Sequence, residues 1–191
     1  MDEIRSDGES KLAELILYIS QKCSLDPKFG AIKLNKILCF SDFTAYGKFG
    51  HGITGVPYCH REFGPAPERF IPIRRYLEST GALLVRKVPL RGGKEQHRTV
   101  ALRDPDLALF SRRELAVIDG MIDSFHELDA DESSELSHQL VGWKITDMDE
   151  TIPYASVFLS DQPLSDGEMK RASELVAIAR QRGLPVELTA S

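Results

Sequence analysis

The sequence predicts an α+β fold: a mainly helical single domain with one β-hairpin and one extended arm. Apolar residues recur every three or four positions in several stretches that begin with helix-capping residues, which is typical of amphipathic helices. Two strand-like stretches flank the glycine-containing turn at residues 91–94, which is typical of a hairpin. The chain has 191 residues, of which 42% are hydrophobic, so it can form a sizeable core.

The first two helices are predicted from their caps. Ser6 and Glu9 have the spacing of a capping box, so the first helix should begin at Ser6. The second helix should begin at Asp26 and Pro27, an N-cap followed by a proline in the first turn, and run to about Tyr46. Its broad apolar surface indicates a place at the centre of the core.

The middle of the chain reads as an arm, a turn, a helix and a hairpin. Residues 53–62 alternate in polarity and predict the extended arm. Residues 63–67 read Phe-Gly-Pro-Ala-Pro and predict a turn, because each proline disfavours helical backbone in the residue before it. A third helix is expected over residues 67–79, ended by Gly81. The arms of the hairpin are expected over residues 82–90 and 96–102.

A second capping box, Ser111 with Glu114, predicts the start of a fourth helix. A short helix is expected over residues 133–140, and residues 141–154 should be irregular because they contain several helix breakers. The last helix should begin at Ser165 and end at Gly183 and Pro185. We therefore divide the chain into a domain of residues 1–160 and a C-terminal helix, residues 161–191, packed on that domain.

The formal net charge is −5, but the charge is segregated along the chain. Residues 61–103 carry +6 and residues 104–191 carry −11. Residues 119–135 contain seven carboxylates and neither lysine nor arginine. On a helix, Asp119, Asp123 and Glu127 would form one exposed row, which is either a solvated face or a docking surface for a basic partner.

Three cysteines without a CxxC pair predict free thiols in a reducing compartment. The acidic N-terminus lacks the apolar region of a secretory signal, and no stretch reaches the roughly 20 apolar residues of a membrane span. These features predict a cytoplasmic protein that does not enter a membrane.

The sequence offers no constellation for catalysis or metal binding. No two of its five histidines are three or four residues apart, so there is no zinc helix motif. It has no nucleophile elbow, phosphate-binding loop or dinucleotide fingerprint. We therefore expect a non-enzymatic protein with no catalytic residue, cofactor or metal.

A helix followed by a basic hairpin also resembles the recognition helix and wing of a DNA-binding protein. The possible nucleic-acid contacts are the basic residues of the hairpin: Arg86, Lys87, Arg91, Lys94 and Arg98. The chain as a whole is acidic, and the third helix lacks a cluster of side chains suited to base edges. A winged-helix-like nucleic-acid-binding regulator is therefore the alternative hypothesis.

Two blocks of the sequence contain motifs that matter together. The first block is Lys-Leu-Asn-Lys-Ile-Leu-Cys-Phe at residues 33–40, followed by Tyr-Gly-Lys at 46–48 and Phe-Gly-Pro-Ala-Pro-Glu at 63–68. The second is Leu-Ser-His-Gln-Leu-Val-Gly-Trp at residues 136–143, followed by Ile-Pro-Tyr at 152–154. In their order and spacing, these blocks resemble the Panacea domain of SocA-like antitoxins. Gly142 stands where that family usually has proline, and Ser137 where it usually has threonine.

The resemblance implies an antitoxin that binds and neutralises a cognate protein toxin, and in some members delivers that toxin to a protease. The residues that carry the motif, and that are candidates for partner binding, are Phe63, Gly64, Pro65, Pro67, His138 and Trp143. Both roles stay open for them: the glycine and prolines fit a structural turn, and the single tryptophan fits either a semi-buried anchor or an interface.

Overall fold

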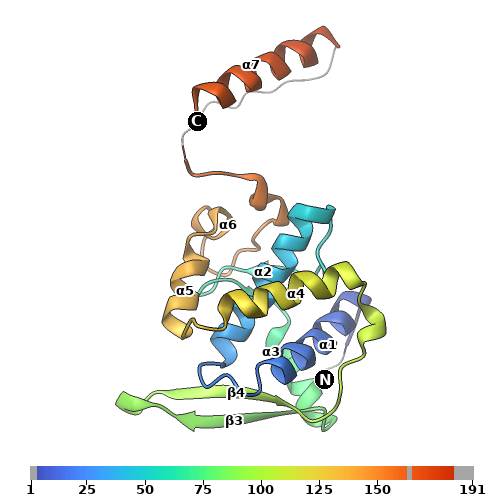
Figure 1. The fold of residues 1–191 in the computed structure, drawn as a ribbon, viewed down its shortest axis with the longest axis vertical. Coiled ribbons are helices and arrows are strands. Elements are labelled where there is room, and N and C mark those ends of the chain that lie inside the picture. The colour runs from blue at the N-terminus through green and yellow to red at the C-terminus, as the bar shows by residue number, and fades with distance from the viewer. Residues whose placement is uncertain (1–3, 163–164, 183–191) are drawn as a thin grey trace. The chain divides into compact units, whose positions relative to one another are not determined.

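The computed structural model describes residues 4–162 and 165–182, and it confirms the mainly helical α+β fold (Figure 1). Over these residues the chain forms seven α-helices and two antiparallel strand pairs. It divides into two compact units, residues 1–159 and residues 160–191. The packing of the C-terminal helix on the domain stays a prediction.

The core of the first unit is built around two helices. In α1 (Asp7–Lys22) the Ser6 hydroxyl accepts a hydrogen bond from the Glu9 amide at 3.2 Å, as predicted. The Glu9 carboxylate accepts from the amide of Arg5 instead of completing a capping box with Ser6. The second helix, α2 (Ala31–Phe49), runs through the middle of the unit, in contact with α1 and with helices from the second half of the chain (Figure 1).

The predicted start of α2 at Asp26 and Pro27 is wrong. The Asp26 carboxylate accepts a hydrogen bond from the amide of Lys28 at 2.8 Å, which closes a turn rather than capping a helix. Gly30 is the actual N-cap. The far end of α2 also extends three residues beyond the predicted Tyr46, to Phe49, and stops at Gly50 with left-handed backbone.

The extended arm contains a short strand, β1 (Tyr58–Cys59), which pairs antiparallel with β2 (Ala66–Pro67). Cys59 forms an additional antiparallel bridge with Thr151. Because β2 occupies Pro67, α3 (Phe70–Ser79) begins three residues later than the sequence predicts.

The hairpin consists of β3 (Leu83–Pro89) and β4 (Glu95–Ala101), joined by the short turn η1 (Arg91–Gly93). Gly92 and Gly93 both have positive φ, as the turn sequence predicts. The inner face of β4 packs on α1, where the hydroxyls of Thr99 and Ser20 lie 2.7 Å apart and both are buried.

Beyond the hairpin, the short turn η2 (Leu107–Leu109) leads into α4 (Arg112–Phe125). The capping box of Ser111 and Glu114 is confirmed, with both hydrogen bonds present. The acidic row of α4 is less exposed than expected at Asp119, because its carboxylate accepts a hydrogen bond from the hydroxyl of Tyr18 at 2.7 Å.

The helix α5 (Ala130–His138) begins before the predicted residue 133, because Asp129 and Glu132 form a further capping box. The segment predicted to be irregular contains the one-turn helix α6 (Val141–Lys144) and leads into the 3₁₀ turn η3 (Tyr154–Phe158). The second unit contains α7 (Asp166–Gln181), and its predicted stop at Gly183 and Pro185 lies outside the described residues.

Candidate interaction site

The residues of the family-like motif meet around Lys36, a lysine in the middle of α2. Its side chain is 1% exposed, and its ammonium group donates a hydrogen bond to the carbonyl of Pro65 at 3.2 Å. Burial lowers the pKa of Lys36 from its ordinary value to about 8. The contact joins α2 to the turn before β2, so this buried lysine holds the turn in place.

Gly64 permits the close approach of three segments of the chain. Its φ is +87°, in the left-handed region that favours glycine. A Cβ atom built at this position would lie 2.1 Å from Oγ of Ser137 and 2.6 Å from Nζ of Lys36. The glycine of the motif is therefore required both by the backbone conformation and by the space between α2 and α5.

Two serines of α5 lie against the other side of the turn, and Ser134 bonds to it. Ser134 donates a hydrogen bond from its hydroxyl to the carbonyl of Phe63 at 3.2 Å. Ser137 donates to the carbonyl of Ser134 at 2.7 Å and is fully buried. The turn is thus held by α2 from one side and by α5 from the other.

Trp143 lies between two imidazole rings. Its ring centroid is 4.3 Å from that of His60 and 4.1 Å from that of His138, with interplanar angles of 22° and 17°. The indole N–H donates to the carbonyl of Arg61 at 3.4 Å. The ring is only partly buried, so Trp143 anchors α6 to the arm as a semi-buried residue.

The surroundings of His138 disfavour its charged form. Partial burial lowers the pKa of His138, and the positive charges of Lys36 and His60 lower it further. Among the described residues, the buried Nε2 of His138 has no hydrogen-bond partner. The ring is held by stacking on Trp143 instead.

The structure therefore brings five of the six motif candidates into one connected region. Gly64 and Pro65 are buried in the turn, and His138 and Trp143 are half-buried beside it. The side chain of Phe63 is 56% exposed and is available to a partner. Pro67 is buried in β2, the strand that follows the turn, where it pairs with Tyr58.

The basic residues of the hairpin have different environments. Lys87 forms an ion pair with Glu95 at 3.2 Å. Arg86 and Lys94 are exposed, and the side chain of Arg91 lies outside the described part of the structure. Arg86, Lys87 and Lys94 are exposed candidates for contact with nucleic acid, and the contact of Arg91 stays a prediction.

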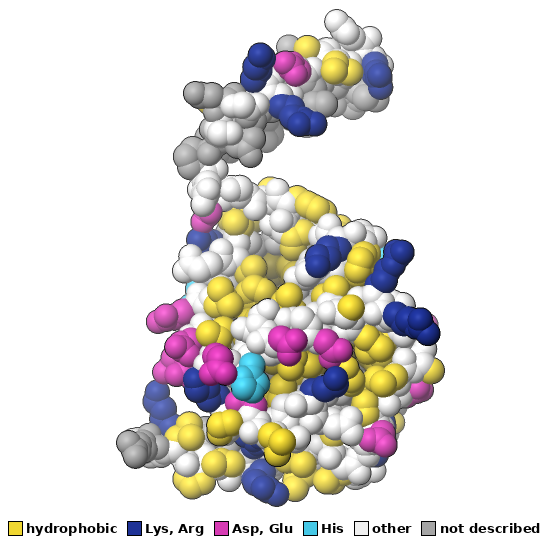
Figure 2. Space-filling view, in the orientation of Figure 1, with side chains coloured by type: hydrophobic (Ala, Val, Ile, Leu, Met, Phe, Trp, Pro, Cys, Tyr) yellow, Lys and Arg dark blue, Asp and Glu magenta, His cyan; other side chains and the backbone are white. Residues whose placement is uncertain are grey.

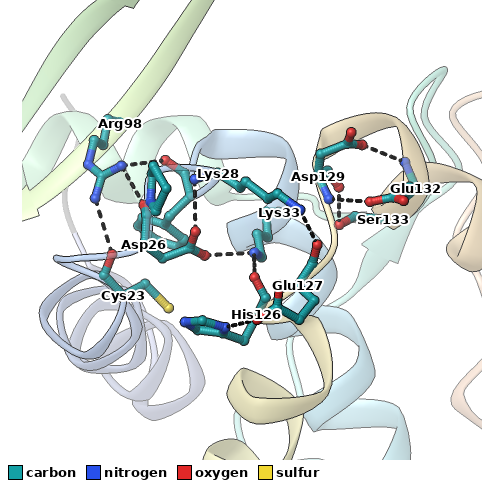
Figure 3. Close-up of polar contacts among 12 residues, drawn as sticks. Cys23, Asp26, Lys28, Lys33, Arg98, His126, Glu127, Asp129, Glu132 and Ser133 are labelled. Atoms are coloured by element: carbon teal, nitrogen blue, oxygen red, sulfur yellow. Dashed lines mark hydrogen bonds and ion pairs between the residues drawn. The ribbon is translucent and has the colours of Figure 1, made fainter.

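Arg98 has a structural task. Its guanidinium donates to the carbonyls of Asp26 and Ser24 at 2.6 Å each and to those of Cys23 and Phe29 at 3.3 and 3.5 Å (Figure 3). These four carbonyls belong to the connection between α1 and α2, so Arg98 fastens the hairpin to that connection. The group is thereby turned away from the phosphate-contacting role that the winged-helix hypothesis gives it.

The burial of one ion pair and of one further carboxylate was not predicted from the sequence. Nζ of Lys33 lies 2.6 Å from Oδ2 of Asp26, and both side chains are buried (Figure 3). Asp42 is fully buried in α2 and accepts hydrogen bonds from the amide and hydroxyl of Thr54 and from the hydroxyl of Tyr58. Burial raises the pKa of Asp42 in spite of these bonds. The available signal was a charged residue in a helix that the sequence places at the centre of the core.

Gly142 was predicted to break a helix, but it lies inside α6. A Cβ atom there would lie 2.1 Å from the hydroxyl of Ser156 and 2.7 Å from the side chain of Ile152. Its small size therefore allows α6 to pack on the following segment.

Neither a metal cluster nor a membrane helix is found in the parts of the chain that the structure describes. No group of three or more histidine, cysteine, aspartate or glutamate side chains there could hold a metal ion. None of the helices within residues 4–162 and 165–182 is long and apolar enough to cross a membrane.

The fold and the site define a small helical domain whose motif positions a turn and a partly exposed aromatic residue. A family model of the antitoxin SocA-like Panacea domain matches residues 34–144. The chain therefore belongs to the SocA-like Panacea antitoxin family, as the sequence motifs indicate. No curated protein and no solved structure matches the chain significantly.

Proposed function

We propose that this protein is the antitoxin of a toxin–antitoxin pair and neutralises its cognate protein toxin by binding it directly. The observation that carries the proposal is the match to the antitoxin family over residues 34–144, the region in which the motif residues assemble. The family supports a toxin–antitoxin role in general, and direct binding is the specific mechanism that we propose.

The arrangement of the motif supports binding rather than chemistry at this site. Lys36, Gly64 and Ser137 are buried against one another and serve the scaffold. The scaffold holds the backbone of Phe63 while leaving its side chain exposed. Exposed aromatic side chains are enriched at protein interfaces, where they can act as anchors.

The alternative, a nucleic-acid-binding regulator, has weaker support. Of the five basic hairpin residues, Arg98 is bound to four backbone carbonyls and is not available to phosphate. Salt-dependent contacts to phosphate require cations that are free to meet the backbone. We therefore expect only weak and non-specific binding to duplex DNA.

The test is co-expression with the protein encoded by the neighbouring gene. We expect that protein to arrest growth when it is expressed alone, and growth to be restored when this chain is present. The two should elute together from a size-exclusion column in a defined ratio. Growth restored without any physical complex would contradict direct neutralisation.

Delivery of the toxin to a protease is a further step that the same complex would permit. The half-life of the toxin, measured after translation is stopped, should then be shorter with the antitoxin than without it. An unchanged half-life would restrict the mechanism to sequestration.

A further inference from the structure

A groove of about 610 Å³ lies between the tip of the hairpin and the start of α5. It is lined by parts of four segments that are far apart in the sequence: the connection into α2, the motif turn, the end of the hairpin and the first residues of α5. The motif residue Phe63 is part of its wall. The groove thus opens next to the site at which the family motif is assembled.

Part of the lining of the groove is apolar and accessible. The side chains of Phe63 and Leu90 are 56% and 46% exposed, and both line the groove. Pro27, Ile32 and Ala130 add further apolar surface. An apolar hollow rimmed by charged side chains is typical of a surface that receives a partner.

The walls of the groove are fixed in advance (Figure 3). Arg98 ties the hairpin to the connection between α1 and α2. Lys33 donates to the carbonyl of His126 at 2.8 Å, and Lys28 donates to the carbonyl of Glu127, so the same connection is tied to the segment that leads into α5. Since the walls need little ordering on binding, the entropic cost of occupying the groove is reduced.

The α5 side of the groove is acidic. Asp129 and Asp131 belong to its lining, with Glu132 and Glu135 on the same helix, and acidic side chains gather over this side of the molecule (Figure 2). Asp129 and Glu132 are occupied in the capping box. Asp131, within the described residues, has no hydrogen bond or ion pair and is exposed, so its charge is available to a basic group.

We propose that this groove is the toxin-binding surface and that it receives a segment of the toxin with a large apolar side chain next to a lysine or arginine. The apolar side chain packs on Phe63 and Leu90, and the basic one faces Asp131. This inference rests on the proposed antitoxin function. A second copy of the chain is the alternative occupant, and the measurements below distinguish it from the toxin.

The decisive measurement is the affinity for the neighbouring gene's protein, by calorimetry, with truncations inside and outside the groove. Phe63→Ala and Leu90→Ala should each weaken binding roughly 10- to 100-fold, the effect of removing an interface anchor. Phe158→Ala and Leu107→Ala are matched controls, because these side chains are 67% and 42% exposed and lie outside the groove. The controls should bind as the unmodified protein does.

The charge of the partner is tested by reversal. Asp131→Lys should weaken binding, and the loss should shrink at high salt because the contact is exposed. The control is Asp123→Lys, which makes the same change of charge at an exposed position outside the groove lining. Equal effects of the two reversals would overturn the assignment of a basic group to Asp131.

A cross-linking measurement covers the case in which a truncation fails to fold. A photoreactive phenylalanine analogue at Leu90 should capture the toxin, and the same group at Leu107 should not.

The outcomes separate the groove assignment from the proposed function. If the toxin binds but the groove variants bind it normally, the groove assignment fails and the antitoxin function stands. If the unmodified protein does not bind the toxin, the proposed function itself fails. If Phe63→Ala abolishes self-association while toxin binding is kept, the occupant is a second copy.

Discussion

Replacing Gly64 by alanine should destabilise the protein more than the same replacement at a left-handed glycine that has open space around it, because the space around Gly64 is filled. The left-handed backbone conformation costs a residue with a Cβ about 1–2 kcal/mol. The new methyl group would also lie 2.1 Å from Oγ of Ser137 and 2.6 Å from Nζ of Lys36, neither of which is at the surface. Overpacking of this kind costs roughly 1–3 kcal/mol.

The expected loss for Gly64→Ala is therefore about 2–5 kcal/mol, the sum of backbone strain and steric overlap. Gly81→Ala is the matched control, because Gly81 also has positive φ, +71°, and a Cβ there would meet nothing within 4 Å. The control should lose only the backbone part, about 1–2 kcal/mol.

Urea unfolding followed by circular dichroism measures both losses. The double variant Gly64→Ala, Ser137→Ala adds a second check, since removal of the Ser137 hydroxyl makes room for the methyl group, and its loss should be smaller than the sum of the two single losses. If Gly64→Ala costs no more than Gly81→Ala, the packing argument for the motif glycine is refuted.

Three other variants test the groups around the turn and the hairpin. Lys36→Met should change the pH dependence of stability. Below about pH 8 the lysine is charged in both the folded and the unfolded protein, whereas from about pH 8 to about pH 10.5 the unfolded protein holds more protons. Over that range the free energy of unfolding of the unmodified protein, measured in urea, should therefore rise by roughly 3 kcal/mol relative to the variant, and a constant difference would contradict a lowered pKa. Arg98→Lys should lower the free energy of unfolding by about 1–2 kcal/mol, because lysine cannot reproduce the forked hydrogen bonds. The control Arg86→Lys, at an exposed position, should leave the melting temperature unchanged, and equal melting temperatures of the two variants would refute the structural role of Arg98. Trp143→Ala should cost about 2 kcal/mol, less than the ~3–5 kcal/mol of a fully buried tryptophan, and a loss at the upper value would show that the ring is in the core.

The sequence predicted the start of a helix correctly where the capping residues allow only one local structure. The Ser111 and Glu114 pair can close only one capping box, and the helix starts there. Asp26 is ambiguous, because an aspartate before proline can cap a helix or close a turn with its own backbone. The buried ion pair with Lys33 accompanies the turn, and that pairing depends on tertiary structure.

The motif turn could be predicted, but the reason for its glycine could not. The sequence Phe-Gly-Pro indicates a turn, whereas the contact of Gly64 with Ser137 joins residues from distant parts of the chain. Lysine is almost never fully buried without a partner, so its residue type alone argues against the buried position of Lys36. The groove beside Phe63 likewise forms only when four separate segments have assembled.

The bridge between Cys59 and Thr151 has a consequence for synthesis of the protein. The arm is completed by backbone hydrogen bonds to this late segment, including the one from the amide of Ile152 to the carbonyl of Tyr58 at 2.8 Å. A nascent chain that already contains the motif turn must wait for these residues to emerge. At roughly 5–20 residues added per second, the wait lasts several seconds. The domain can therefore fold completely only after residues 150–152 have been synthesised, several seconds after the motif turn.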